Sequence, residues 1–295
     1  MELARTLDAL HRGSSIAVTG IATIADAGAG ELCFVGDPER YGADLSRALA
    51  AGAVVLAPEG FEPDPSSSGA GISVANPRAA FAHVVARYFA ARAEAGIAAT
   101  AIVHPSAQVA ATASVGEFSV IGAGVVIGDD AEVRHHVVLG SRVRIGARTL
   151  IKSHAVIGEE GFGIEKNVHG DNVRLPHLGS VVIGDDAEVG NFTTVCSGTI
   201  SPTIVGDFTK IDDHVHIAHN VSIGRNAIIT ACAEVSGSVT IEDDVWIGPN
   251  ASVIQGLTLG ARSLIGMGSV VVKSVPPDEV QFGSPARKMR SKADG

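Results

Sequence analysis

Residues 205–241 read VGDFTKIDDHVHIAHNVSIGRNAIITACAEVSGSVTI, with an aliphatic residue at every sixth position. An α-helix repeats its apolar face about every 3.6 residues and a strand about every 2, so neither explains this spacing. A period of six is typical of a chain that turns a corner every six residues, as the coils of a left-handed parallel β-helix do. Gly, Asp, Asn and Ala often follow the aliphatic residue, as tight turns require.

The six-residue repeat extends well beyond this stretch and predicts about eight coils of three corners each. It continues without a break to Val271, an earlier run covers Val103 to Ile157, and a short run covers Ile183 to Val195. Residues 158–182 and 196–204 interrupt it. Long insertions in a compact fold are usually functional loops, although a tolerated surface insertion is the alternative.

The sequence before the repeat predicts a small α/β domain. Short apolar strands occur at 52–56 and 72–74, separated by a loop at 63–69 that is rich in Pro, Ser and Asp. An alanine-rich helix is expected from Pro77 to about Glu94.

We therefore expect three parts along the chain. An α/β domain covers 1–98, a β-helix covers 99–273 with its two insertions, and a C-terminal tail covers 274–295. The tail is expected to leave the prism at Pro276-Pro277 and to be short and basic.

The composition narrows the classes of function. A net charge of −10 over 295 residues argues against a nucleic-acid-binding surface. No apolar run approaches the length of a membrane span, and the N-terminus lacks a signal-peptide core, so a cytoplasmic protein is expected. Cys33, Cys196 and Cys232 are too few for a disulfide framework and are interpreted as small buried hydrophobic residues.

One motif breaks the repeat in a chemically informative way. His219 lies two positions after the corner Ile217, and Gly237 lies two positions after the corner Val235, 18 residues later. One coil should therefore place Gly237 over His219. A base beside an exposed backbone amide is what acyl transfer needs, since the amide can stabilise an oxyanion. Asp212 precedes His219 by seven residues and is predicted to hydrogen-bond to its other ring nitrogen.

Plainer interpretations of these histidines stay open. A histidine in a β-helix turn is often a solvated polar residue. His214, His216 and His219 could form a metal site, but the run crosses a corner, so no metal is expected. The remaining histidines of the repeat and its insertion are interpreted as surface or loop residues: His135, His136, His154, His169 and His177.

These motifs resemble the UDP-3-O-acylglucosamine N-acyltransferases of lipid A biosynthesis. The resemblance rests on Gly161-Phe162-Gly163, residues 175–179 (LPHLG), residues 183–186 (IGDD) and above all residues 210–212 (KID) with 217–221 (IAHNV). It implies that His219 is the general base, Asp212 its orienting carboxylate and Gly237 the oxyanion amide, with Asn220 contacting substrate.

The resemblance also implies that the N-terminal domain binds the uridine of a sugar nucleotide. The family pattern Phe-x-x-Asn-Pro-x-Tyr is matched by Phe34 and Tyr41, but Asp37 replaces the asparagine and one extra residue precedes the tyrosine. An ionised carboxylate accepts hydrogen bonds and cannot donate them. Recognition of another base, such as thymine, therefore stays open.

The chain departs from the family in three further places. Cys196-Ser197 replaces an Asp-Arg pair, Leu257 replaces a histidine near the acyl donor, and the C-terminal helical extension that helps to dock an acyl carrier protein is missing.

The ending Gly283-Ser284-Pro285-Ala286-Arg287-Lys288 instead resembles coenzyme-A-dependent hexapeptide acetyltransferases that act on nucleotide-linked amino sugars. Coenzyme A needs only a few cations near its phosphates. Donor contacts are therefore assigned to Gly256, Lys273 and Arg287, and Lys288, Arg290 and Lys292 add to the basic tail. The donor is acyl-coenzyme A or acyl carrier protein, a co-substrate rather than a cofactor.

The sequence thus predicts an N-acyltransferase that acts on the amine of a nucleotide-linked amino sugar. Flat apolar walls favour a homotrimer, with the amine reaching a groove between adjacent prisms. O-acylation of a sugar hydroxyl and a non-catalytic β-helix scaffold are the rival interpretations.

Overall fold

The computed structural model describes residues 3, 10–13, 15–91 and 93–291. These residues form two compact units, Met1–Arg92 and Ala93–Gly295. Among the described residues, none belongs to a helix long and apolar enough to cross a membrane.

The first unit is an α/β domain, as predicted. Its described strands form one sheet in the order β1-β5-β4-β3-β2, parallel except where β1 meets β5. The strands are β1 (Leu10–Gly13), β2 (Gly20–Ile21), β3 (Glu31–Phe34), β4 (Val54–Pro58) and β5 (Ala70–Val74), and the helices are α2 (Gly42–Ala50) and α3 (Pro77–Tyr88).

The two helices pack on opposite faces of this sheet because side chains alternate along each strand. Leu45 and Leu49 of α2 join a buried cluster with Cys33, whereas Val84 of α3 joins another with Leu32. The side chain of Asn76 accepts a hydrogen bond from Ala79 N at 3.0 Å and caps α3, which ends six residues before the predicted Glu94.

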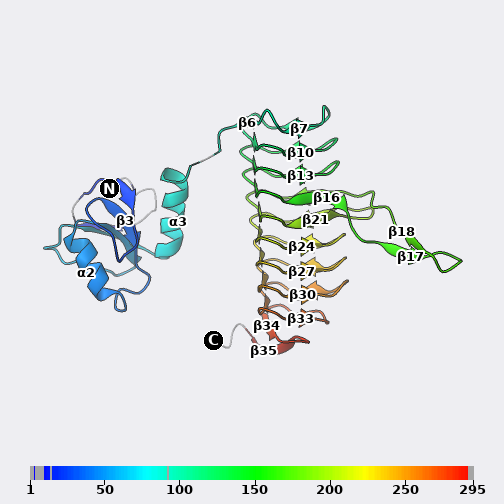
Figure 1. The fold of residues 1–295 in the computed structure, drawn as a ribbon. Helices are drawn as coiled ribbons and strands as arrows, with labels where there is room; N and C mark the ends of the chain where they lie inside the picture. Colours follow the sequence, from blue (N-terminus) through cyan, green and yellow to red (C-terminus); the bar gives the residue numbers. More distant parts are fainter. Residues whose placement is uncertain (1–2, 4–9, 14, 92, 292–295) are drawn as a thin grey trace. The chain divides into compact units, whose positions relative to one another are not determined.

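The second unit is the predicted left-handed parallel β-helix, and Figure 1 shows its coils stacked along one axis. The first wall contains β6 (Gly96–Ile97), β9 (Ser114–Val115), β12 (Glu132–Val133), β15 (Leu150–Ile151), β20 (Glu188–Val189), β23 (Lys210–Ile211), β26 (Ile228–Ile229), β29 (Trp246–Ile247), β32 (Leu264–Ile265), β34 (Glu279–Phe282) and β35 (Arg287–Ser291). The second wall contains β7 (Ile102–Val103), β10 (Val120–Ile121), β13 (Val138–Leu139), β16 (Val156–Glu160), β21 (Thr194–Ser197), β24 (His216–Ile217), β27 (Glu234–Val235), β30 (Ser252–Val253) and β33 (Val270–Val271). The third wall contains β8 (Gln108–Val109), β11 (Val126–Ile127), β14 (Arg144–Ile145), β19 (Val181–Ile183), β22 (Thr203–Val205), β25 (Ser222–Ile223), β28 (Thr240–Ile241) and β31 (Thr258–Leu259).

The six-residue repeat sets the register between coils. Ile217 pairs with Val235 and Val235 with Val253, one period of 18 residues each, and all three side chains are fully buried. The short insertion lengthens one coil, so Val195 pairs with Ile217, 22 residues later. Burial of the aliphatic corners along the prism axis supplies the main stabilisation of the stack.

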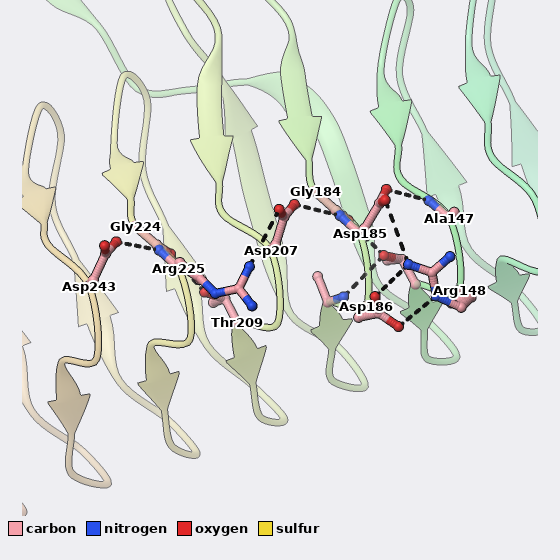
Figure 2. Close-up of polar contacts among 12 residues, drawn as sticks. Ala147, Arg148, Gly184, Asp185, Asp186, Asp207, Thr209, Gly224, Arg225 and Asp243 are labelled. Carbon is pink, nitrogen blue, oxygen red and sulfur yellow. Dashed lines mark hydrogen bonds and ion pairs between the residues drawn. The ribbon is translucent and has the colours of Figure 1, made fainter. Parts of the chain in front are cut away.

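Turns between the third and first walls carry a row of carboxylates that bind the amides of the preceding coil (Figure 2). Asp185 accepts from Ala147 N at 2.8 Å, Asp207 from Asp185 N at 2.8 Å, and Asp243 from Arg225 N at 2.7 Å. Each amide belongs to the second residue after an aliphatic corner. In this carboxylate ladder, three amides that the backbone leaves unpaired each take an anionic oxygen.

The long insertion forms an arm, defined here as residues 161–180. Its tip is the antiparallel hairpin of β17 (Ile164–Lys166) and β18 (Asn172–Arg174), which projects from the prism (Figure 1). Phe162 and Val168 are 82% and 95% exposed.

The predicted C-terminal tail is instead part of the prism. β34 pairs in parallel with β32 and antiparallel with β35, so a hairpin extends the first wall. The ring of Phe282 occupies the space that a side chain on Gly266 would need, which explains how the hairpin packs against the last coil. Lys292 lies outside the described residues.

Candidate active site

Gly237 lies directly against the imidazole of His219, as the 18-residue spacing predicts. A Cβ atom on Gly237 would lie 2.6 Å from His219 Cε1 and 2.7 Å from Nε2. Ser238 N also donates to His219 O at 2.9 Å across the same pair of coils. Glycine is therefore needed here for space beside the ring.

The orienting partner of His219 is Asn220 rather than Asp212. His219 Nδ1 lies 3.1 Å from Asn220 Oδ1, and because an amide oxygen only accepts, Nδ1 carries the proton and Nε2 is left as the base. Asp212 is exposed, and its carboxylate accepts from Asp213 N at 2.8 Å. The predicted bond between Asp212 and His219 is wrong within one chain, because β24 separates their two corners.

The short insertion holds Asn220 in place. Asn220 Oδ1 also accepts from Thr199 N at 3.1 Å and from Thr199 Oγ1 at 2.9 Å, while its Nδ2 donates to Ser201 O at 3.3 Å. The side chain predicted to contact substrate is thus occupied by the protein and positions the base.

Like the amides bound by the carboxylate ladder, the amide of Gly237 belongs to the second residue after an aliphatic corner, but its turn lies between the second and third walls. Within the described part of the chain, no acceptor pairs with Gly237 N, whereas Gly237 O accepts from Gly256 N at 3.0 Å. The residue one coil further on at this corner is Gln255, and it does not accept a hydrogen bond from Gly237 N. This donor beside His219 is available to an oxygen of a ligand.

His177, which the sequence assigned to the surface or a loop, is buried in the site. The residue is 6% exposed, and its ring lies edge-on to that of His219, with ring centroids 5.2 Å apart and planes at 62°. Burial lowers the pKa of His177, and the neighbouring His219 lowers it further. The arm returns to the prism without the six-residue period, so spacing gave no signal for this contact.

The family departures at 196 and 197 lie at the base of the arm. Ser197 Oγ donates to Gly158 O at 2.8 Å, and burial raises the pKa of the Cys196 thiol. Leu257, in place of the family histidine, packs against the apolar core. Cys33 is buried as expected, but Cys232 is exposed.

The other histidines of the motif do not converge on a metal site. No group of three or more His, Cys, Asp or Glu side chains suited to a metal ion occurs in the described residues. His214 instead ends a stack of exposed rings on the corner between the first and second walls, with adjacent centroids 4.6–5.2 Å apart. The stack consists of Phe118, His136, His154, Phe192 and His214.

The first unit contains a separate pocket where the sequence predicted a nucleotide site. A cavity of about 520 Å³ is lined by Phe34 and Tyr41 together with Ile24 and Phe81, and the rings of Phe34 and Phe81 are 5.2 Å apart. Asp37 is not among the lining residues; its Oδ1 accepts from Arg40 N at 3.0 Å and closes a turn. The aromatic part of the prediction thus converges on one cavity, whereas Asp37 does not.

The predicted donor residues are spread over the C-terminal coils. Gly256 occupies a left-handed turn at φ 72°, where open space surrounds the Cα atom. Lys273 and Arg287 are exposed, and Arg287 Nη1 donates to Ala286 O at 3.1 Å. The neighbouring Lys288 forms an ion pair with Glu279 at 2.9 Å.

Comparison with known proteins finds matches along most of the chain. The profile of LpxD, UDP-3-O-(3-hydroxymyristoyl) glucosamine N-acyltransferase, matches residues 15–87. The hexapeptide repeats of bacterial transferases match 202–237 and 238–273, and the GMPPB C-terminal domain matches 97–204.

Two solved structures share the β-helix. The UDP-N-acetylglucosamine acyltransferase of Francisella novicida superposes with a TM-score of 0.62 at 27% identity and covers 68% of this chain and 71% of its own. LpxA of Acinetobacter baumannii gives a TM-score of 0.61 at 28% identity, covering 67% and 75%.

Among curated relatives, the UDP-3-O-acylglucosamine N-acyltransferase of Methylorubrum extorquens strain PA1 is 42% identical over 137 residues, 46% of this chain. That match spans about two fifths of the relative, 39% of its length. The enzyme of the same name from Delftia acidovorans is 42% identical over 269 residues, which cover 90% of this chain and 79% of the relative. Identity of this extent places the chain in the family of UDP-3-O-acylglucosamine N-acyltransferases.

Proposed function

We propose that the protein transfers an acyl group from a thioester to the amine of a UDP-linked, 3-O-acylated glucosamine. The observation that carries the proposal is the pairing of the His219 imidazole with the Gly237 amide across one coil. The names of the relatives supply the substrate class, and the pocket of the first unit supplies a place for a nucleotide base.

The geometry of His219 supports general-base catalysis. With the proton on Nδ1 facing Asn220, Nε2 accepts a proton from the sugar amine as its nitrogen bonds to the thioester carbonyl carbon. The carbonyl oxygen becomes an oxyanion that the Gly237 N–H stabilises. Collapse of this intermediate breaks the C–S bond, and the proton on Nε2 passes to the departing thiolate.

The first unit is proposed to bind the uracil base between Phe34 and Tyr41. Stacking of a base on aromatic side chains contributes about 1–3 kcal/mol per base. Since Asp37 is engaged by Arg40 N, the aromatic rings carry this part of the proposal.

The donor is proposed to be acyl-coenzyme A or an acyl carrier protein, with contacts at Gly256, Lys273 and Arg287. Exposed cations near the end of the prism support phosphate binding by either donor. No prosthetic group takes part in the proposed mechanism.

A homotrimer in the cytoplasm completes the proposal. Exposed apolar side chains on the prism and arm, including Phe118 at 58%, Phe192 at 53% and Leu178 at 68%, support packing against further copies. The three cysteines are free, as a reducing compartment allows. Sedimentation equilibrium tests the trimer, and a monomer at working concentration would contradict it.

The decisive test is a mass-spectrometric assay of the purified protein. UDP-3-O-acylglucosamine is incubated with acyl-coenzyme A and, separately, with acyl carrier protein, and a matched sugar with a hydroxyl in place of the amine is run in parallel. Amide formation that His219→Ala abolishes is expected. Ester formation on the hydroxy sugar alone would favour O-acylation, and no product with either donor would favour a binding scaffold.

A further inference from the structure

His177 is a buried polar side chain that the proposed mechanism does not use. The residue is 6% exposed, and neither ring nitrogen makes a hydrogen bond of standard geometry to a described residue, although the backbone of Leu175 lies close enough to influence the ring. Burying a polar group without a well-formed hydrogen bond costs stability. A phenylalanine or leucine would fill similar space without that cost, so the imidazole calls for an explanation beyond packing.

The base of the arm encloses this ring together with His219. A Cβ atom on Gly161 would lie 3.1 Å from His177 Nε2 and 3.1 Å from His219 Cβ, and one on Gly163 would lie 3.1 Å from His177 Cε1. The two glycines bring backbone within contact distance of the rings. The rotamer of His219 is thus set on one side by Asn220 and on the other by the ring edge of His177.

Burial and the neighbouring His219 and Arg174 disfavour the charged form of His177, whereas the backbone of Leu175 and the carboxylate of Glu160 favour it. His219 lies edge-on to His177, and Glu160 of β16 pairs with Arg174 of β18 at 2.8 Å. Burial lowers the pKa of His177 first, and His219 lowers it next. The net effect is a lowered pKa, so the closed arrangement of arm and ring favours neutral His177.

We propose that His177 is a positioning residue for acyl transfer: in its neutral form it holds the imidazole of His219 edge-on beneath the base of the arm. Protonation of His177 removes this support, because a charged imidazole does not stay buried without a partner. The site then has two histidines that must both be neutral, His219 to accept a proton and His177 to place it. This inference deepens the proposed function and rests on it for its kinetic consequences.

Three variants separate the possible roles. His177→Phe keeps a ring of similar size but does not titrate, His177→Ala removes the support, and His169→Phe is a matched control on the exposed tip of the same arm. The expected kcat of His177→Phe at pH 8 is within about threefold of wild type, whereas that of His177→Ala falls about tenfold or more with little change in KM for the nucleotide sugar.

The kinetic signature is the acid side of the kcat profile, measured over about pH 5–8. In wild type both His177 and the base must be deprotonated, whereas His177→Phe has only the base to deprotonate. The kcat of the variant should therefore fall less steeply at low pH, by up to about tenfold less for each pH unit below the His177 transition. His169→Phe should follow wild type. Identical profiles for wild type and His177→Phe would reduce His177 to a space filler, and a large kcat loss at all pH values in His177→Phe would mean direct proton transfer.

A substrate-free measurement keeps this inference separate from the proposed reaction. In NMR titrations of protein carrying labelled histidine, the His219 ring resonance should shift as His177 titrates, and His177→Phe should remove that shift. Because no acyl transfer is involved, this result stands even if the assigned substrates prove wrong. The same pH dependence of the His219 resonance in wild type and His177→Phe would overturn the proposal.

Discussion

Gly237→Ala tests the contact on which the site depends. The new Cβ would lie 2.6 Å from His219 Cε1, whereas ordinary van der Waals contact begins near 3.4 Å, so the ring must move by about 0.8 Å. A misplacement of about 1 Å at a reacting group costs on the order of 10²-fold in rate. We therefore expect kcat to fall about 100-fold, with KM for the nucleotide sugar nearly unchanged.

The assay is steady-state acyl transfer combined with calorimetry. Overpacking typically costs about 1–3 kcal/mol, so the Tm should drop modestly and the fold should persist. Ser236→Ala, one residue away in the same turn, is the matched control, since its side chain donates to Glu234 at 2.9 Å and to no other residue that the structure describes.

A double-mutant cycle isolates the clash. In the His219→Ala background the imidazole is gone, so adding Gly237→Ala should no longer lower the Tm. Gly237→Ala with wild-type kcat, or with the same Tm loss in both backgrounds, would refute the stacking of these two residues.

Three further predictions concern other residues of the sites. His219→Ala should lower kcat by roughly 10²–10⁴, the range for a lost general base, without changing the oligomeric state; kinetics and sedimentation check this, and activity near wild type would exclude the assigned role. Asn220→Ala should lower kcat about tenfold through loss of the bond to Nδ1, and Asn220→Asp, which keeps an acceptor, should recover part of it in the same assay. Phe34→Ala should raise KM for the nucleotide sugar through loss of about 1–3 kcal/mol of base binding, while kcat stays unchanged. Asp37→Asn should leave the preference for the nucleotide base unchanged in calorimetry, and a switch of preference would return Asp37 to the site.

The repeat predicts contacts between coils unusually well, because each aliphatic corner fixes the register of its neighbours. The pair His219 and Gly237 follows from an 18-residue spacing alone. The spacing argument failed for Asp212. Although Asp212 is only seven residues from His219, the strand β24 lies between the corners that carry the two side chains, and Asp212 accepts from Asp213 N instead.

The six-residue repeat does not extend into the insertions, so it cannot predict where their side chains lie. His177 reaches His219 through the return of the arm, and Thr199 and Ser201 reach Asn220 through the short insertion. The glycines at 161 and 163, where the arm leaves the prism, indicate that the backbone there lies close to other groups. They do not identify those groups as His177 and His219. Tertiary contacts of this kind become visible only once the chain has been folded back onto the prism.

The stacking of coils also determines how the molecule can come apart. Each coil is held mainly by the coil above and the coil below, so the β-helix is close to a one-dimensional lattice in which opening starts at a free end and advances coil by coil. On the second wall, β30 and β33 lie between the coil of Gly237 and the C-terminal end. Fraying from that end would therefore release Lys273 and Arg287 while His219 and Gly237 were still clamped between intact neighbours. If Lys273 and Arg287 bind the donor as proposed, affinity for the donor should be the first property lost on mild destabilisation, and the arrangement of His219 with Gly237 the last.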